Sequence, residues 1–362
     1  MHCHKIMNGV RYYYYKTVKR YEIPVAIGKT KMDSKEKNNH FIYALKAIAI
    51  FSVVCAHSTP LPGGSGQWNV LCSQILDYLG TFGVPVFFCI SGYLFAGNTR
   101  TLREFWQRKV TTLFLPWIFC ETVLWFYVVL RKGGISVTAW LLFLLGYHHT
   151  TYYLTILVVF YVIYWKIRSN KAVWALNLIS ILSIAETGWN VGIFHRLNEM
   201  LNSYYLNPFN WMIFFGIGLL IRRQSQKIVE MFFDWKGLLC LLGSVIYFSI
   251  NNFLGREMYY FSRFALIGNL LNVGAVIYLG HTLMNAKWKK AVWKIGQTSF
   301  SIYLLHQFFA GIVVAVTNHW DFFILTLCRP WIILGITVGT VMVMEWCFRG
   351  KMQWVRMLVG ER

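Results

Sequence analysis

The sequence has little charge for its length. Only 14% of its 362 residues are Asp, Glu, Lys or Arg, whereas 57% are hydrophobic and 18% aromatic. This composition excludes the class of soluble globular proteins and is typical of membrane proteins. Acidic residues are scarcest, 14 against 35 Lys and Arg, so the formal net charge is +21.

Other features are absent too, and each absence excludes a class of site or partner. No Cys, His, Asp or Glu spacing matches a metal site, and no glycine loop resembles a nucleotide-binding fold. We therefore expect no metal and no tightly bound cofactor. Residues 1–40 hold no continuous apolar core, so no signal peptide is expected there. Basic residues stand mostly between apolar runs, which argues against a nucleic-acid partner.

Ten apolar segments have about the length that crosses a bilayer, although the sixth is short. They are residues 41–59, 75–95, 111–130, 150–167, 172–189, 208–221, 237–253, 264–283, 299–316 and 330–347. The run 137–146 is too short to cross and is expected to be an interfacial or re-entrant helix. The predicted fold is all-α, a polytopic integral membrane protein with about ten transmembrane helices.

The basic residues indicate an orientation. If residues 1–40 are cytoplasmic, the inner segments hold 28 Lys and Arg and the outer connections hold 6, Arg329 among them. This bias follows the positive-inside rule and predicts that both termini are cytoplasmic.

Three parts are expected along the chain. Residues 1–40 form a basic, disordered cytoplasmic leader, and translation starts at Met1 or at Met32. Residues 41–348 form the ten-helix domain, and 349–362 a short basic cytoplasmic tail. We see no separate soluble domain and no internal repeat.

Most of the eight cysteines fall in apolar segments, where a reduced thiol acts as a small hydrophobe. Cys72 and Cys328 lie in or beside connecting loops, so a disulfide between them is conceivable.

The first apolar segment, FIYALKAIAIFSVVCAHST, carries two ionisable groups, Lys46 and His57. Such groups cost a few kcal/mol each in hydrocarbon, so they usually face a cavity lined by protein. Eleven residues are about three helical turns, which puts both on one face roughly 16 Å apart. They could bind the two ends of a long anionic molecule. A snorkelling lysine and a satisfied core histidine would give the same pattern.

Two further pairs of residues have both structural and functional readings. Ser91 and Gly92, in the second segment, suit close helix packing. Arg108 and Lys109 precede the third segment, and charges that set the topology explain most such pairs. Donors for a phosphate group would look the same in sequence.

Polar groups also lie at membrane depth in the third and ninth segments. Glu121 could orient an imidazole, pair with Lys46 or be protonated. Ser299, Tyr303 and His306 stand at i, i+4 and i+7, so they line one helix face. Such a stripe points into a cavity or a helix contact.

Together these stretches resemble the acyltransferase 3 family of membrane O-acyltransferases, from about Phe41 to the C-terminus. Four family motifs occur in order: basic-x10-His, FFxxSG-aromatic, a basic loop before a helix-opening proline, and Ser-x3-Tyr-Leu-x-His. The residues carrying them are Lys46 and His57; Phe87, Phe88, Ser91, Gly92 and Tyr93; Arg108, Lys109 and Pro116; and Ser299, Tyr303, Leu304 and His306. Lys46 replaces the family's usual arginine and loses its planar fork, Tyr43 replaces an acidic residue, and Thr112 stands near a missing arginine.

The resemblance implies an O-acyltransferase of the bacterial cytoplasmic (inner) membrane. It would move an acyl group, acetyl by default, from acyl-CoA to a hydroxyl of a cell-surface polysaccharide or its lipid-linked precursor. No metal is needed, because a thioester is already an activated acyl donor. The implied partners are the lipid bilayer, acyl-CoA (acetyl-CoA) as co-substrate and a glycan acceptor.

Residue roles follow from the same resemblance. His57 is the implied catalytic residue, acting as a general base or as a covalent acyl carrier. The implied substrate contacts are Lys46, Arg108, Lys109, Ser91, Tyr303 and His306, with Glu121 in support. The alternative is a polytopic transporter of an anionic metabolite or glycan lipid, although the paired broken helices of many transporters are not visible.

The charge bias generates a first prediction. In a cysteine-depleted background, Gly64→Cys should react with an impermeant thiol reagent in intact cells, and Ser225→Cys should not. The reverse labelling pattern would overturn the orientation, and with it the side from which acyl-CoA arrives.

Overall fold

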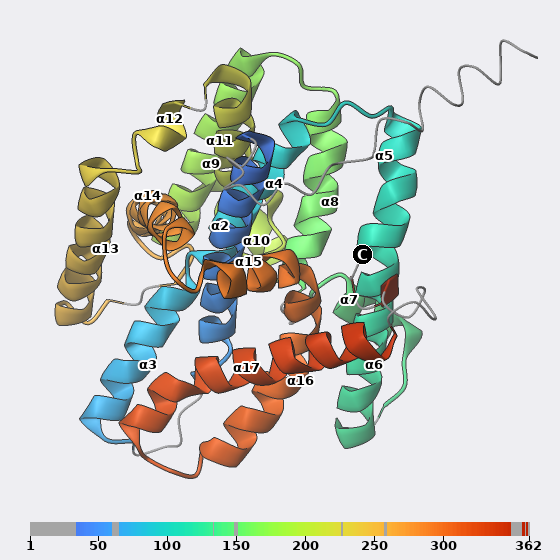
Figure 1. Ribbon diagram of the computed structural model, residues 1–362, viewed down its shortest axis with the longest axis vertical. Helices are drawn as coiled ribbons and strands as arrows, with labels where there is room; N and C mark the ends of the chain where they lie inside the picture. The colour runs from blue at the N-terminus through green and yellow to red at the C-terminus, as the bar shows by residue number, and fades with distance from the viewer. Residues whose placement is uncertain are drawn as a thin grey trace, which may run out of the picture. The chain divides into compact units, whose positions relative to one another are not determined.

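The computed structural model is helical and has no strand among the residues it describes (Figure 1). Those residues are 34–59, 65–132, 134–147, 151–225, 227–256, 259–348, 357–358 and 360. Asn38–Arg362 form one compact unit, and every site and contact discussed below lies within it. Most of the expected leader and tail, Met32 and Gly64 lie outside the described residues.

The helices follow one another with short connections. In the first half they are α2 Ser34–Ala56, α3 Gln67–Gly80, α4 Gly83–Ala96, α5 Leu102–Lys109, η2 Val110–Phe114, α6 Leu115–Lys132, α7 Val137–Leu144, α8 Tyr152–Trp165 and α9 Asn170–Trp189. In the second half they are α10 Gly192–Met200, η3 Pro208–Asn210, α11 Met212–Gln224, α12 Lys227–Glu230, α13 Trp235–Phe253, α14 Ala265–Met284, α15 Lys289–Gln297, α16 Ser299–Thr317 and α17 Phe323–Cys347.

The predicted class, an all-α polytopic membrane protein, is confirmed. Within the described part, eight helical stretches are long and apolar enough to cross a membrane. The segments predicted at 150–167 and 208–221 are the shorter helices α8 and α11, of 14 and 13 residues. Because a straight crossing takes about 20 residues, the count of ten stays a prediction, as does the cytoplasmic side of the termini.

The second predicted segment, 75–95, is two helices rather than one. α3 and α4 meet at a break, and Pro85 falls in the first turn of α4, where its missing N–H leaves no hydrogen bond unmade. The break lies against α2, since a Cβ on Gly83 would come 2.6 Å from the carbonyl oxygen of Ala49. The bend therefore brings α4 into close contact with α2.

The expected basic loop before Pro116 is wrong, because α5 continues through the π-helical turn η2 into α6 (Figure 1). A wider turn accommodates a proline ring that would clash in a regular helix. The hydroxyls of Thr111 and Thr112 both donate to the carbonyl of Arg108, at 3.1 and 2.9 Å. Arg108 and Lys109 are thus the last two residues of α5 and lie on a helix, not in a loop.

Arg329 is not in an outer connection, because α17 begins at Phe323 instead of at Pro330. Its side chain is fully buried. Nε donates to the hydroxyl of Thr317 at 2.8 Å, and Nη2 donates to the Thr317 carbonyl at 3.1 Å. The sequence analysis took Pro330 as the start of the helix and therefore counted Arg329 among the outer connections. The excess of Lys and Arg in the inner segments remains when Arg329 is left out of that count.

The conceivable disulfide between Cys72 and Cys328 is absent. Both thiols are free, Cys72 buried in α3 and Cys328 exposed on α17. The side-chain direction of Cys328 is set by α17, since this residue lies inside a helix and not in a loop.

α4 and α11 are in backbone contact at the centre of the described unit. A Cβ on Gly92 would clash with the carbonyl oxygen of Phe215, and one on Gly218 with that of Cys89. Small residues are what allow such close approach between membrane helices. Gly92 therefore serves helix packing, and the short α11 is buried from Met212 to Leu220 except at the half-buried Ile217.

This contact predicts a contrast between two glycines. Gly218→Ala should lower the thermal midpoint of the detergent-purified protein, at a cost of about 1–3 kcal/mol, because α4 and α11 must separate. Gly311→Ala is the control, since nothing lies within 4 Å of the added Cβ. Equal midpoints for the two variants would contradict the packing described here.

Candidate functional site

A cavity of about 710 Å³ lies at the end of α2. Two of the predicted site residues, His57 and Tyr303, line it. Tyr303 belongs to the predicted polar stripe on α16, and that stripe, which includes Ser299 and His306, is buried throughout. We call this space the His57 cavity.

His57 stands one residue beyond the last residue of α2. Its backbone N–H donates to the carbonyl of Val54 at 3.1 Å, so it closes the helix as a turn. The buried Ser58 fixes this turn, because its hydroxyl donates to the Cys55 carbonyl at 2.8 Å. The half-buried imidazole is therefore presented at the cavity from a defined backbone.

His306 is the neighbour of His57, and their ring centroids lie 5.3 Å apart. Its Nδ1 is 2.6 Å from the carbonyl oxygen of Tyr303 and 3.2 Å from that of Ile302. A carbonyl oxygen only accepts hydrogen bonds, so Nδ1 carries the proton. The Gln307 amide nitrogen lies 3.3 Å from Nε2. The His306 ring is thus held in one orientation through Nδ1.

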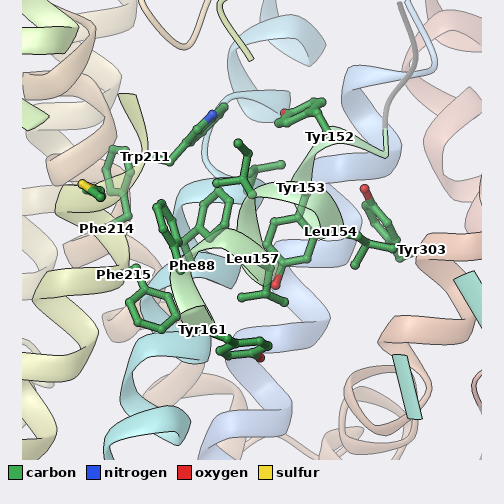
Figure 2. Packing of buried hydrophobic residues seen from close by; sticks show 14 of the residues in the cluster. Phe88, Tyr152, Tyr153, Leu154, Leu157, Tyr161, Trp211, Phe214, Phe215 and Tyr303 are labelled. Carbon is green, nitrogen blue, oxygen red and sulfur yellow. The ribbon is translucent and has the colours of Figure 1, made fainter. Parts of the chain in front are cut away.

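Ser91 is connected to the cavity through a residue that the sequence analysis missed, Tyr153 of α8. The Ser91 hydroxyl lies 3.1 Å from the Tyr153 hydroxyl. The Tyr153 ring packs between Phe88, at 4.8 Å, and Tyr303, at 5.7 Å between centroids (Figure 2). Tyrosines near helix ends are common in membrane proteins, so nothing in the sequence distinguished this one.

The structure does not bring Arg108 and Lys109 to the His57 cavity. Lys109 points to α8, where Nζ donates to the Tyr161 hydroxyl at 3.0 Å and lies 4.4 Å from the ring centroid. Arg108, its neighbour on α5, is exposed. The two basic groups therefore face different surroundings.

Arg222 contacts Tyr93, the aromatic residue of the FFxxSG-aromatic motif. The sequence analysis counted Arg222 only among the basic residues that indicate the topology. Arg222, at the end of α11, donates from Nη1 to the Tyr93 hydroxyl at 2.9 Å, and its guanidinium carbon lies 5.1 Å from that ring centroid. Arg222 remains exposed. Tyr93 thus holds an accessible guanidinium near the end of α4.

Lys46 and Glu121 lie apart from the lining of the His57 cavity. Lys46 is half-buried within α2. Glu121 is buried in α6, a helix that contacts α16 where the rings of Tyr127 and Phe308 lie 6.2 Å apart. The roles suggested for both residues stay predictions.

These observations define a class, a helical membrane protein with a cavity lined in part by histidine and tyrosine. A family model described as an acyltransferase domain matches residues 39–347, and the chain belongs to this acyltransferase 3 family. The resemblance seen in the motifs is confirmed, and the protein is an integral membrane acyltransferase. No curated protein and no solved structure matches the chain.

The contact between Ser91 and Tyr153 predicts a coupling. Ser91→Ala and Tyr153→Phe should each lower the free energy of unfolding by about 1 kcal/mol, because each removes the same hydrogen bond. The double variant should therefore be no less stable than either single one.

The control pairs Tyr153→Phe with Ser249→Ala, whose hydroxyl donates to the Val245 carbonyl of its own helix at 2.9 Å. That pair should be additive in thermal unfolding of the purified protein. Additive losses for Ser91→Ala and Tyr153→Phe would show that the hydroxyls do not interact.

Proposed function

We propose that the chain transfers an acyl group, acetyl by default, from acyl-CoA to a hydroxyl of a cell-surface polysaccharide or of its lipid-linked precursor. The carrying observation is the placement of His57, presented at a cavity of about 710 Å³ beside the buried His306. Imidazole is the side chain best suited to proton transfer near neutral pH. Family membership supports acyl transfer as the reaction.

In this proposal His57 is the general base. Its imidazole takes the proton of the acceptor hydroxyl as the hydroxyl oxygen attacks the thioester carbonyl carbon. The carbon–sulfur bond then breaks, and the CoA thiolate takes the proton back from His57. The products are the ester and free CoA. General base catalysis of this kind contributes about 10²–10⁴-fold in rate.

The neighbours of His57 have distinct parts in the proposed reaction. His306 keeps its proton on Nδ1 against two backbone carbonyls, so its ring is fixed and positions the His57 ring by packing. Tyr303 lines the cavity and carries a hydroxyl that can donate. A donor aimed at the carbonyl oxygen would stabilise the negative charge that develops there.

The donor is proposed to approach from the opposite end of α2. The phosphates of acyl-CoA would bind exposed cations at that end, such as Arg108 and Arg222. The arm carrying the thioester would pass Lys46 and reach the His57 cavity, roughly 16 Å further along α2. The acceptor would enter at the His57 end. Donor and acceptor would then meet from opposite sides of the membrane.

The base role predicts a specific kinetic defect. His57→Ala should reduce acyl transfer by roughly two orders of magnitude or more while acyl-CoA binding stays nearly unchanged, because only bond making is affected. His319→Ala is the control, an exposed histidine after α16 that does not line the cavity. Activity is measured per folded, membrane-extracted molecule as CoA release that depends on the acceptor.

Normal specific activity of His57→Ala would refute the base role. A wild-type protein that moves a solute across the membrane without releasing CoA would favour the transporter instead. An acyl-imidazole trapped on His57 would replace the base mechanism with the covalent one.

The position of Lys46 predicts the complementary defect. Lys46→Met should weaken acyl-CoA binding roughly ten- to a hundred-fold, since a charge-assisted contact is worth about 1.5–3 kcal/mol. Lys46→Arg should be tolerated, because the charge remains and the planar fork is gained. Direct binding of acyl-CoA to purified protein measures both, and unchanged affinity in Lys46→Met would remove Lys46 from the donor site.

A further inference from the structure

One wall of the His57 cavity is polar and comes from a single short segment, residues 198–205, which ends α10 and follows it. We call this segment the polar wall. It lines the cavity with Asn198, Glu199, Asn202, Ser203, Tyr204 and Tyr205. Tyrosine offers an apolar ring face and a hydrogen-bonding tip, and convergent polar groups give a pocket its specificity.

A buried amide network holds the polar wall in place. Asn198 donates from Nδ2 to the Thr187 hydroxyl of α9 at 2.8 Å and accepts from Nδ2 of Asn207 at 2.7 Å. Asn210 donates from Nδ2 to the backbone carbonyl of Tyr204 at 3.0 Å. Satisfied buried networks are rigid, so the polar wall is held in one conformation.

The polar wall carries one carboxylate. Glu199 supplies the carboxylate, with Oε1 3.4 Å from Nε2 of His195 one turn earlier. Among the described lining residues there is no Lys or Arg. The arginines that flank Tyr260, Arg256 and Arg263, stack over aromatic rings that do not line the cavity.

We infer that the polar wall binds the acceptor and that Glu199 limits it to uncharged or amine-bearing sugars, excluding acidic ones. The inference rests on the proposed function, since it concerns the acceptor of that reaction. A uronic acid or phosphorylated sugar would bring a second anion to Glu199, in a cavity whose described lining holds no Lys or Arg. Like-charge juxtaposition of this kind is a common way to reject a wrong ligand.

The test uses the purified full chain, acetyl-CoA and three soluble acceptors with the same ring: methyl glucoside, methyl glucosaminide and methyl glucuronide. The wild type should acetylate the first two with kcat/KM at least about tenfold higher than the third. Glu199→Gln should reduce this preference. Glu199→Lys should reverse it towards the glucuronide, through the acceptor KM, with the acetyl-CoA KM unchanged.

Arg196→Gln is the matched control. This exposed residue is on the same helix and does not line the cavity, so its substitution should leave the preference as in the wild type. A wild type that acetylates the glucuronide as well as the glucoside would overturn the inference. So would an unaltered preference in Glu199→Lys with a normal acetyl-CoA KM. If acetyl-CoA does not bind and no acceptor is acetylated, the proposed function itself fails, and this inference with it.

Discussion

The structure depends on one constraint, the cost of leaving a polar or charged group without a partner in hydrocarbon. Several buried polar groups among the described residues are therefore tied to backbone or side-chain partners. The Arg329 guanidinium donates hydrogen bonds to Thr317. The Nδ1–H group of His306 donates to backbone carbonyls of its own helix. Asn210 is fully buried and anchors the turn before α11. These ties fix the elements around the His57 cavity.

Helix geometry then sets where the site forms. The break between α3 and α4 lets α4 pass close to α2 on one side and, through Gly92, close to α11 on another. This close approach places Ser91 within reach of Tyr153 on α8. Tyr153 in turn contacts Tyr303, so a continuous row of side chains connects the centre of α4 with the cavity. We interpret this row as the frame that orients the proposed catalytic groups.

Much of the fold could be predicted because apolar length is a strong signal. The helix class and most helix positions follow from it, and the polar stripe on α16 follows from helical spacing. The helix breaks were harder to predict than the helices, because a proline is allowed at several positions relative to a helix. Pro85 lies in a first turn, Pro116 follows a π-turn and Pro330 lies inside a helix.

The site was harder to predict, because it depends on contacts between residues far apart in the chain. Spacing picked out His57 and His306 separately, but only the packing of α2 beside α16 puts their rings 5.3 Å apart. Tyr153, Arg222 and the polar wall had no distinctive pattern, since tyrosines, basic residues and short polar segments are common at the ends of membrane helices.

The central claim is that acyl donor and acceptor meet at the His57 cavity from opposite sides of the membrane. Proteoliposomes in which all molecules share one orientation test it most directly, with labelled acetyl-CoA and a soluble sugar acceptor placed on chosen sides. We predict that ester forms when acetyl-CoA is at the end bearing Arg108 and Arg222 and the acceptor is at the His57 end. Ester formation only when both substrates are on the same side would contradict the account.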